Sequence, residues 1–240
     1  MMVVPAIILS LIFGSVGFIV TKNNAKYILS GYNTMSEADR AKVDIDGYLS
    51  FFKRFHVFLG VSLFTGTNLI SFLNNNWASA FMIMYPLFAY LHLIIRGNLF
   101  YNNSKTRKVS TYFTCGILIV VIIIIGFTQL SSYKSNDLVI SDKVLEINGM
   151  YSLKIEKQDI LTLKLVDEIP AISYKSNGFA GGDYAKGSFK AKNGKTIKLF
   201  VNKSISPTLW FETTQGDIYY NSEEEDMNGL YKKIMQWRGL

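Results

Sequence analysis

Residues 112–130 read YFTCGILIVVIIIIGFTQL, a run without a single charged side chain. A helix needs about 17–25 mostly apolar residues to cross the hydrocarbon core of a bilayer, and this run has that length. Downstream of it the pattern changes, because apolar and polar residues begin to alternate with a period of two. The run therefore predicts a membrane helix that ends shortly before a strand-rich domain.

Three further apolar runs precede this one, at residues 3–20, 57–73 and 77–95. With residues 112–130 they predict an α-helical region of four transmembrane helices over residues 1–130. A core helix of a soluble protein is the alternative for the weaker runs, above all for residues 57–73. The first run has neither a preceding positive charge nor a small-residue cleavage site, so we expect an uncleaved anchor rather than a signal peptide.

Basic residues are distributed unevenly around these spans. The chain has a net charge of +7, yet residues 131–240 carry fifteen basic and fourteen acidic side chains, so the excess lies in the membrane half. Ten basic residues fall in the segments 21–56 and 96–111: Lys22, Lys26, Arg40, Lys42, Lys53, Arg54, Arg96, Lys105, Arg107 and Lys108. Only Lys134 and Lys143 follow the fourth span closely.

The positive-inside rule then gives a direction. It predicts a multi-pass protein of the cell membrane, with a cytoplasmic loop at residues 21–56 and an extracytoplasmic domain at residues 131–240. Loss of one span would return that domain to the cytoplasm. The basic excess is a sign of membrane topology, so we expect the lipid bilayer as a partner and no nucleic acid.

The loop 21–56 contains the segment GYNTMSE at residues 31–37. Thr34 and Glu37 have the spacing of a capping box, which predicts a short helix over residues 35–42. This segment, with Asp44 and the two spans that follow, resembles a small uncharacterised bacterial membrane family with one span, a GYNT-type loop and two further spans. The resemblance covers roughly residues 1–100 and implies a bacterial membrane protein, but no activity.

The C-terminal domain has eight predicted strands, at residues 138–140, 143–147, 151–155, 160–166, 187–191, 196–202, 208–213 and 217–221. Asn148-Gly149 and Asn193-Gly194 are strong hairpin signals, and Gln215-Gly216 suits another turn. After Glu223 an amphipathic helix is expected. The pattern predicts an all-β barrel whose open end is plugged by the C-terminal helix.

This domain resembles the bacterial pleckstrin-homology-like domains over roughly residues 135–238. The resemblance is carried by DEIP at residues 167–170, NGFAGG at 177–182, GSF at 187–189 and the terminal helix. It implies a binding or assembly platform. Since no arginine occurs between Ser131 and Trp237 and the lysines are scattered, we expect no phosphoinositide ligand.

The segment 177–184 is the candidate binding surface, because its glycines permit close backbone approach and its aromatic side chains are expected to be exposed. A structured loop beside the barrel mouth is the alternative. The candidate ligand-binding residues are Asn177, Gly178, Phe179, Gly181, Gly182 and Tyr184.

No catalytic or metal-binding pattern accompanies this segment. His56, His92 and Cys115 are the chain's only histidines and cysteine, so no zinc site is expected, and no cofactor is predicted. We therefore expect a non-enzymatic protein whose outer domain binds a peptide, a protein or an envelope ligand in sensing, assembly or self-protection. The alternatives are an accessory subunit of a transporter or other membrane complex, joined through Gly60, Ser62, Gly66 and Asn68, and an enzyme whose chemistry the sequence does not reveal.

Overall fold

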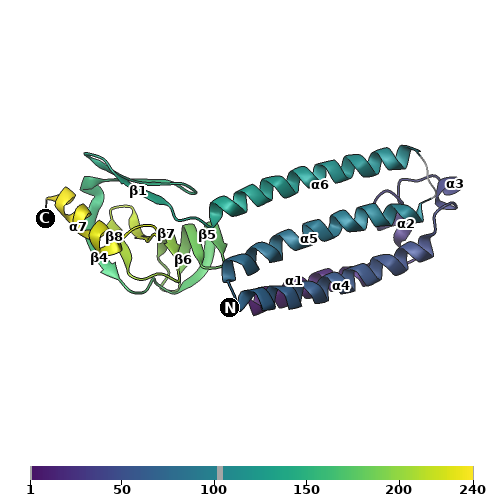
Figure 1. Cartoon of the computed structure of the whole chain (residues 1–240), viewed down its shortest axis with the longest axis horizontal. Coiled ribbons are helices and arrows are strands. Elements are labelled where there is room, and N and C mark those ends of the chain that lie inside the picture. The colour runs from purple at the N-terminus through teal and green to yellow at the C-terminus, as the bar shows by residue number, and fades with distance from the viewer. Residues whose placement is uncertain (1, 102–104, 240) are drawn as a thin grey trace. The chain divides into compact units, whose positions relative to one another are not determined.

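The computed structural model describes residues 2–101 and 105–239, with the side chains of residues 105–108 left out (Figure 1). It consists of two compact units, residues 1–128 and residues 129–240. The first unit is helical, and the second, called the sheet domain below, is mostly strands. The sequence placed the boundary at residue 130.

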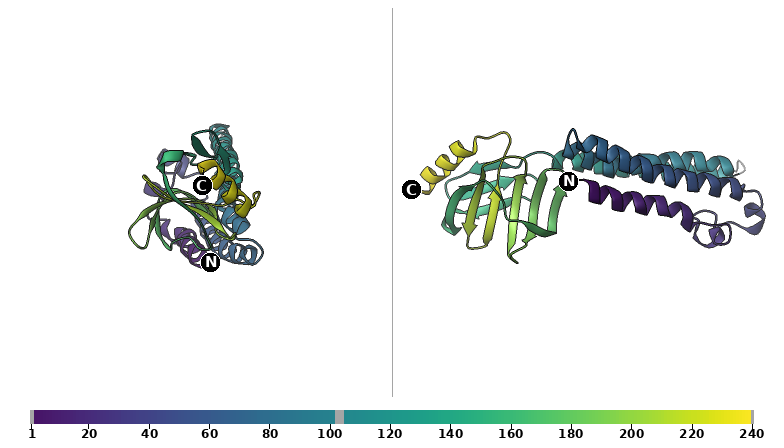
Figure 2. Two further views of the ribbon diagram at one scale, coloured as in Figure 1. Left: turned by 90° about the vertical axis from the view of Figure 1, so that its left-hand side faces the viewer. Right: turned by 90° about the horizontal axis from the view of Figure 1, so that it is seen from below.

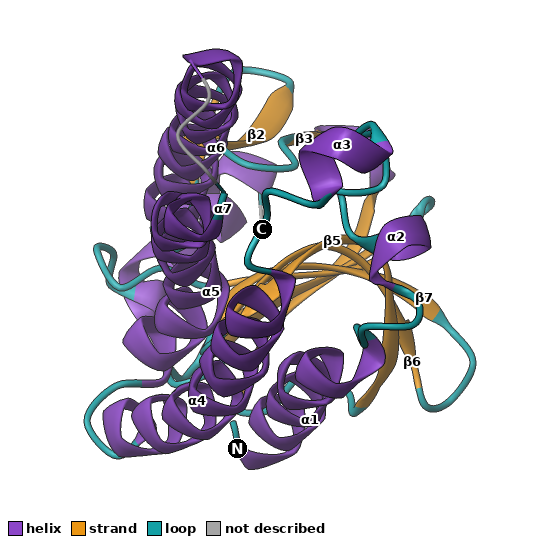
Figure 3. Ribbon diagram, turned by 90° about the vertical axis from the view of Figure 1, so that its right-hand side faces the viewer, coloured by secondary structure: helices purple, strands orange, loops and turns teal. Residues whose placement is uncertain are grey.

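The helical unit contains the three long helices α1, α4 and α5 and most of a fourth, α6, whose C-terminal end continues into the sheet domain (Figure 3). Helix α1 packs against α4, and α4 packs against α5. The elements are α1 (Val3–Ile19), α2 (Ala25–Ile28), α3 (Glu37–Arg40), α4 (Ile45–Ser71), α5 (Asn75–Gly97), the 3-10 turn η1 (Asn98–Phe100) and α6 (Lys105–Ser132), whose last turn belongs to the sheet domain.

Two stretches of the described chain are long and apolar enough to cross a membrane, Asn75–Phe100 and Val109–Ser132. Helix α1 is also apolar, but with 17 residues it is shorter than these two stretches. These helices are compatible with a membrane protein. Helix α4 is longer than the second predicted span, residues 57–73, because it already begins at Ile45. Asp44 caps its start by accepting a hydrogen bond from the Gly47 N–H at 2.9 Å.

The loop between α1 and α4 is therefore shorter than residues 21–56. His56, expected at its end, is fully buried inside the helical unit, with Nδ1 2.8 Å from the Phe52 carbonyl. The predicted capping box is also wrong. Ser36 caps α3 by accepting from the Asp39 N–H at 3.2 Å, because its hydroxyl is held at 2.8 Å by the Asp39 carboxylate.

In its described residues, the sheet domain contains nine strands in two sheets, the 3-10 turn η2 (Lys157–Asp159) and one α-helix that lies entirely within it. A three-stranded antiparallel sheet has the order β1-β2-β3, and a six-stranded sheet has the order β4-β8-β9-β7-β6-β5. Their bounds are β1 (Asp137–Ile140), β2 (Val144–Asn148), β3 (Leu153–Glu156), β4 (Ile160–Val166), β5 (Ile172–Gly181), β6 (Tyr184–Ala191), β7 (Thr196–Asn202), β8 (Thr208–Thr213), β9 (Gly216–Tyr220) and, for the helix, α7 (Met227–Arg238).

The hairpin turns follow the glycine signals in the sequence. Gly149 and Gly194 have φ values of +109° and +83°, in the left-handed region that glycine adopts without a steric penalty. The C-terminal helix is also confirmed, with Asp226 as its cap, whose carboxylate accepts from the Asn228 and Gly229 N–H groups. Of the described strands, β5 is the one that the alternation pattern did not predict.

The prediction of a closed barrel is wrong. Strands β4 and β5 are the two edges of the six-stranded sheet and do not pair, although only residues 167–171 join them. A flat sheet of six strands is about 24 Å wide, and six Cα–Cα steps span about 20 Å when extended. The sheet must therefore be curled, but it is left open (Figure 2).

Two apolar clusters lie on opposite faces of this curled sheet. On one face, the small sheet and α7 cover β4, β8 and β9, with Leu145, Phe211 and Ile234 all buried in the same cluster. On the other face, Phe189 and Leu199 form a second cluster, against which Ile169 of the edge-to-edge link packs. Four of the six candidate binding residues lie at the β5–β7 end of the first face: Asn177, Phe179, Gly181 and Tyr184.

Candidate functional site

The candidate segment 177–184 is a β-hairpin and not a loop. Residues 177–181 form the end of β5, Gly182 lies in the turn with φ +53°, and Tyr184 begins β6. Asn177, Phe179 and Gly181 alternate along β5, and Gly181 pairs with Tyr184. Since side chains two residues apart share a face, the structure brings four of the six candidates to one side of the sheet.

Gly178 lies where the two strands of the hairpin approach each other closely. A Cβ atom at Gly178 would lie 2.2 Å from the backbone carbonyl of Lys186, and Gly187 opposite has a φ of +106°. The two strands approach so closely here that neither position accommodates a side chain. Gly178 and Gly187 thus allow the tight pairing of β5 with β6.

The expected exposure of Tyr184 is wrong, because only 4% of this side chain is exposed. Its hydroxyl donates to Glu223 Oε1 at 2.6 Å, and the Asn202 amide donates to the same oxygen. Burial, reinforced by the Glu223 carboxylate, raises the pKa of Tyr184 to about 12. Tyr133 packs edge-on against both Tyr184 and Phe179, with ring centroids 6.1 and 5.4 Å apart.

The covering element is the connector, residues 133–136, which joins α6 to β1. The Lys186 ammonium donates to the Lys134 carbonyl, and the Tyr220 hydroxyl donates to the Asn136 carbonyl at 2.7 Å. Backbone carbonyls of the connector are thus bonded to β6 and β9, which hold it over the face that carries Phe179. Periodicity alone gives no sign of this long-range contact.

Lys186 is the least expected residue of the region, because a lysine on a strand is normally solvated. It is 2% exposed and pairs across the sheet with Phe179 and Phe200. Burial lowers its pKa to about 8, and the carboxylate of Asp137 opposes this shift. Nothing in the sequence signalled this burial, because Lys186 precedes the predicted strand at residues 187–191 and shares a face of β6 with Ser188 and Lys190, which are polar.

A polar pocket of about 360 Å³ opens near the buried side chains of Tyr184 and Lys186. It lies between the β2–β3 turn and the face of β5, β6 and β7. Its lining residues are Gly149, Tyr151, Ser152, Leu153, Asn177, Gly187, Ser188, Lys198 and Phe200. Asn177 is the one candidate ligand-binding residue that reaches it. The other lining residues were not among the candidate ligand contacts predicted from the sequence.

Strand register explains how this pocket forms. Asn177 pairs with Ser188 on β6, and Ser188 pairs with Lys198 on β7, so the three side chains form one row across three strands. No ion pair joins Lys198 to a carboxylate in the described parts of the chain. The row therefore presents an amide, a hydroxyl and an ammonium group to the same small volume.

Tyr151 lies at the rim of this pocket with a φ of +60°, a left-handed conformation that costs a residue other than glycine of order 1 kcal/mol. Histidine, cysteine, aspartate and glutamate are all missing from the nine lining residues. In the described residues, no group of three or more such side chains lies close enough to hold a metal ion. The pocket is chemically suited to holding an anionic group by hydrogen bonds and charge.

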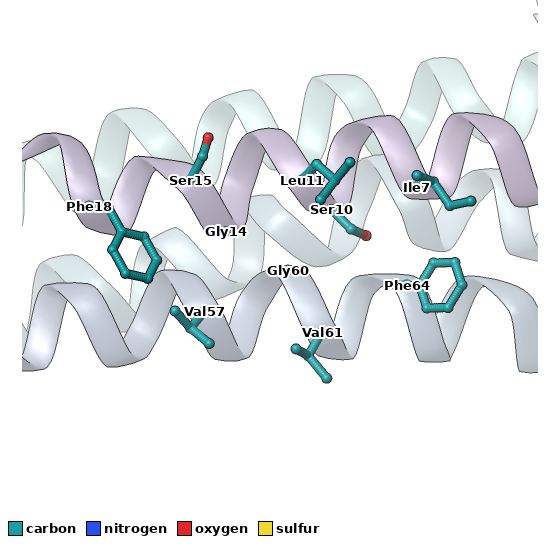
Figure 4. Close-up of a pocket in the computed structure, with 10 residues that line it drawn as sticks. All are labelled: Ile7, Ser10, Leu11, Gly14, Ser15, Phe18, Val57, Gly60, Val61 and Phe64. Atoms are coloured by element: carbon teal, nitrogen blue, oxygen red, sulfur yellow. The ribbon is translucent and has the colours of Figure 1, made fainter.

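The helical unit contains a different cavity, an apolar groove of about 750 Å³ between α1 and α4 (Figure 4). It is lined by Ile7, Ser10, Leu11, Gly14, Ser15, Phe18, Val57, Gly60, Val61 and Phe64. A hydrocarbon chain is the occupant that suits this lining, and the groove offers few groups for recognising anything more specific.

The four residues considered as contacts for a membrane complex have neighbours within the chain. A Cβ at Gly60 would lie 2.6 Å from the Ser10 carbonyl of α1, and Gly66 faces the Phe81 ring. The Ser62 hydroxyl is 2.6 Å from the hydroxyl of Tyr85 on α5. The Asn68 amide donates to its own helix, at the Phe64 carbonyl.

Comparison with known proteins gives one match. Residues 7–105 match a family described as a domain of unknown function, DUF3784. The match spans α1 to α5 and covers less than half of the chain, so the sheet domain lies outside it. No curated protein and no solved structure matches the chain.

Proposed function

We propose that this chain is a non-enzymatic, multi-pass membrane protein whose sheet domain faces outward and binds a peptide, a protein or an envelope ligand. The observation that carries the proposal is the polar pocket. It combines Asn177 of the candidate segment with Lys198, an ammonium group that has no carboxylate partner among the described residues.

The membrane part of the proposal rests on the surface of the helices. Besides the two long apolar stretches, large apolar side chains of α1 and α4 outside the groove are more than half exposed, among them Val4, Phe58 and Leu69. Such a surface is costly in water and favourable in lipid. We therefore propose that α1 and α4 also cross the membrane, which makes four spans.

The outward direction of the sheet domain rests on the ten basic residues in segments 21–56 and 96–111, against two just after α6. The resemblances to a GYNT-loop membrane family and to pleckstrin-homology-like domains support the proposed role of the protein. They favour a bacterial membrane protein with a binding platform, for which a curled sheet with a C-terminal helix is suited. An accessory subunit of a membrane complex is less favoured, because Gly60, Ser62 and Gly66 contact other helices of the same chain.

The orientation is tested by cysteine labelling in intact cells. In a Cys115→Ala background, Ser173→Cys on the exposed edge of β5 reports on the sheet domain, and Ser30→Cys reports on the loop after α1. A membrane-impermeant maleimide is expected to label the first variant in intact cells and the second only after lysis. Labelling of Ser30→Cys but not Ser173→Cys in intact cells would refute the outward orientation.

The binding role is tested with the full chain in nanodiscs against a displayed library of random ten-residue peptides. Peptides enriched on the wild-type chain are expected to be lost from Lys198→Glu. Lys192→Glu is the matched control, because it makes the same charge change at an exposed lysine outside the pocket. No enrichment over empty nanodiscs, or equal loss from both variants, contradicts binding at the pocket.

A further inference from the structure

We propose that the free edge of β5 pairs with an acidic, extended polypeptide segment, whose carboxylates point toward Lys198. This inference rests on the proposed function and names the class of its ligand. Its three supports are the open edge, the charge of the strands beside it and the row of side chains that leads from the edge to the pocket.

The edge itself is long. Strand β5 has ten residues and, in the parts of the chain that the structure describes, pairs with β6 alone. Residues 173–177 are all exposed. A strand at the edge of a sheet presents unpaired N–H and C=O groups, to which an extended peptide can add as a further strand.

Pairing is best suited to one half of this edge. Register irregularities fall between Ile172 and Tyr174 and between Lys175 and Asn177, whereas residues 177–181 pair regularly with β6. Bulges of this kind make an edge less able to form a long, flat pairing with another copy of itself. The regular half is the half that begins at the pocket.

The strands beside this edge are strongly basic. Residues 172–203 carry seven lysines against one acidic residue, Asp183. Lys195 forms an ion pair with Asp217 at 3.8 Å, and Lys186 is buried. Lys175, Lys192 and Lys198 have no carboxylate partner among the described residues.

This charge selects among occupants of the edge. A second copy pairing β5 with β5 would bring two lysine-rich surfaces together, which opposes association. An acidic segment would instead be attracted, because its carboxylates would pair with lysines that have no carboxylate partner among the described residues of the chain. Charge complementarity therefore favours an acidic segment over self-pairing.

The register places one of its side chains. A strand added beside β5 lies about 4.8 Å from it, and the residue opposite Asn177 points to the same face as Asn177. The row then reads, from the edge inward, added residue, Asn177, Ser188 and Lys198. A glutamate or aspartate at the added position extends over Asn177 toward the ammonium of Lys198, which extends from the other end of the row.

The probe is a ten-residue peptide that alternates glutamate and valine, tested against the full chain in nanodiscs by fluorescence anisotropy. Its counterpart with lysine in place of glutamate is expected to bind at least about tenfold more weakly. Two isomers, N-methylated at odd or at even residues, lose donors on opposite edges of the peptide. Only one isomer is expected to lose affinity, because only one edge pairs with β5.

Lys198→Glu is expected to lower affinity for the acidic peptide at least about tenfold, and Lys192→Glu by much less. Equal binding of acidic and basic peptides, or equal tolerance of both methylation patterns, would overturn the inference. If the random library yields ligands that need Lys198 but are not acidic, the proposed function stands and the inference fails. If it yields none, and the acidic peptide does not bind, both fail.

Discussion

Replacing Lys186 with methionine changes how the stability of the sheet domain depends on pH. Methionine has a similar length and no charge, so it fits between Phe179 and Phe200 while removing the buried ammonium. The wild-type lysine has a pKa of about 8 in the folded state, against 10.5 for an ordinary lysine. The unfolded state therefore binds more protons than the folded state between these two values.

The sign follows from this difference in proton binding. Below pH 8 the cost of burying the ammonium is fully present, and it disappears as the pH rises toward 10.5, so the wild-type free energy of unfolding increases across this window. Between about pH 7.5 and about pH 9.5 the increase is about 2 kcal/mol. The Lys186→Met variant lacks this contribution, so its stability relative to the wild type falls by the same amount.

The assay is urea unfolding of the full chain in detergent, followed by the fluorescence of Trp210 and Trp237 in a Trp77→Phe background. Urea midpoints and slopes at several pH values give the difference in unfolding free energy between wild type and Lys186→Met. Lys175→Met, at an exposed lysine of β5, is the control and is expected to show no such pH dependence. A difference for Lys186→Met that stays constant within about 0.5 kcal/mol over this pH range would refute the assigned burial of the ammonium.

Three further substitutions test the packing. Ile234→Ala in α7 removes a fully buried side chain and is expected to lower the free energy of unfolding by about 2–5 kcal/mol, measured by the same urea titration. Gly178→Ala is expected to destabilise the domain by more than Gly194→Ala, because the first places a Cβ 2.2 Å from a backbone carbonyl, whereas the second meets no atom within 4 Å and adds only the cost of its left-handed φ of +83°, about 1 kcal/mol; equal losses would contradict the tight hairpin. In the helical unit, Gly60→Ala is expected to lower the thermal midpoint in detergent and Gly14→Ala to leave it nearly unchanged, since only Gly60 lies against a backbone carbonyl of α1; the reverse order would refute the α1–α4 contact.

The sequence predicted much of the fold because the relevant signals were local. Strands β4, β7 and β8 have the predicted bounds, and the glycine turns at Gly149 and Gly194 were identified by their dipeptides. The parallel pairing of β7 with β9 is different, because it brings together residues about twenty positions apart that no alternation relates. The open sheet could not be distinguished from a barrel for this reason.

For the candidate segment 177–184, the sequence did not predict the structural environment. Residues 177–184 were singled out for their glycines, and four of the six candidates share a face, but β5 was not predicted as a strand, because asparagine and glycine are poor strand formers. The burial of Tyr184 depends on the connector, which precedes it by about fifty residues. Lys198 carried no signal of its own, since its importance comes from strand register.

The strand order of the large sheet also determines when this domain can fold. Strand β4 is synthesised early, but its partner is β8, so Leu163 cannot pair with Phe211 until β8 has been made. The central strand β9 is the last strand to be synthesised. Pairings this distant along the chain are slow to form and leave apolar strand edges exposed meanwhile. In the proposed outward orientation, the strands would leave the translocation channel before their partner strands are synthesised. A chain cut short before Thr208 would keep the β5–β7 hairpins but lose β8 and β9, so β4 would lose its partner strand, and Phe211 and Ile218 would be missing from the core. The domain therefore depends on the residues from Thr208 onward for the strands that join its two edges.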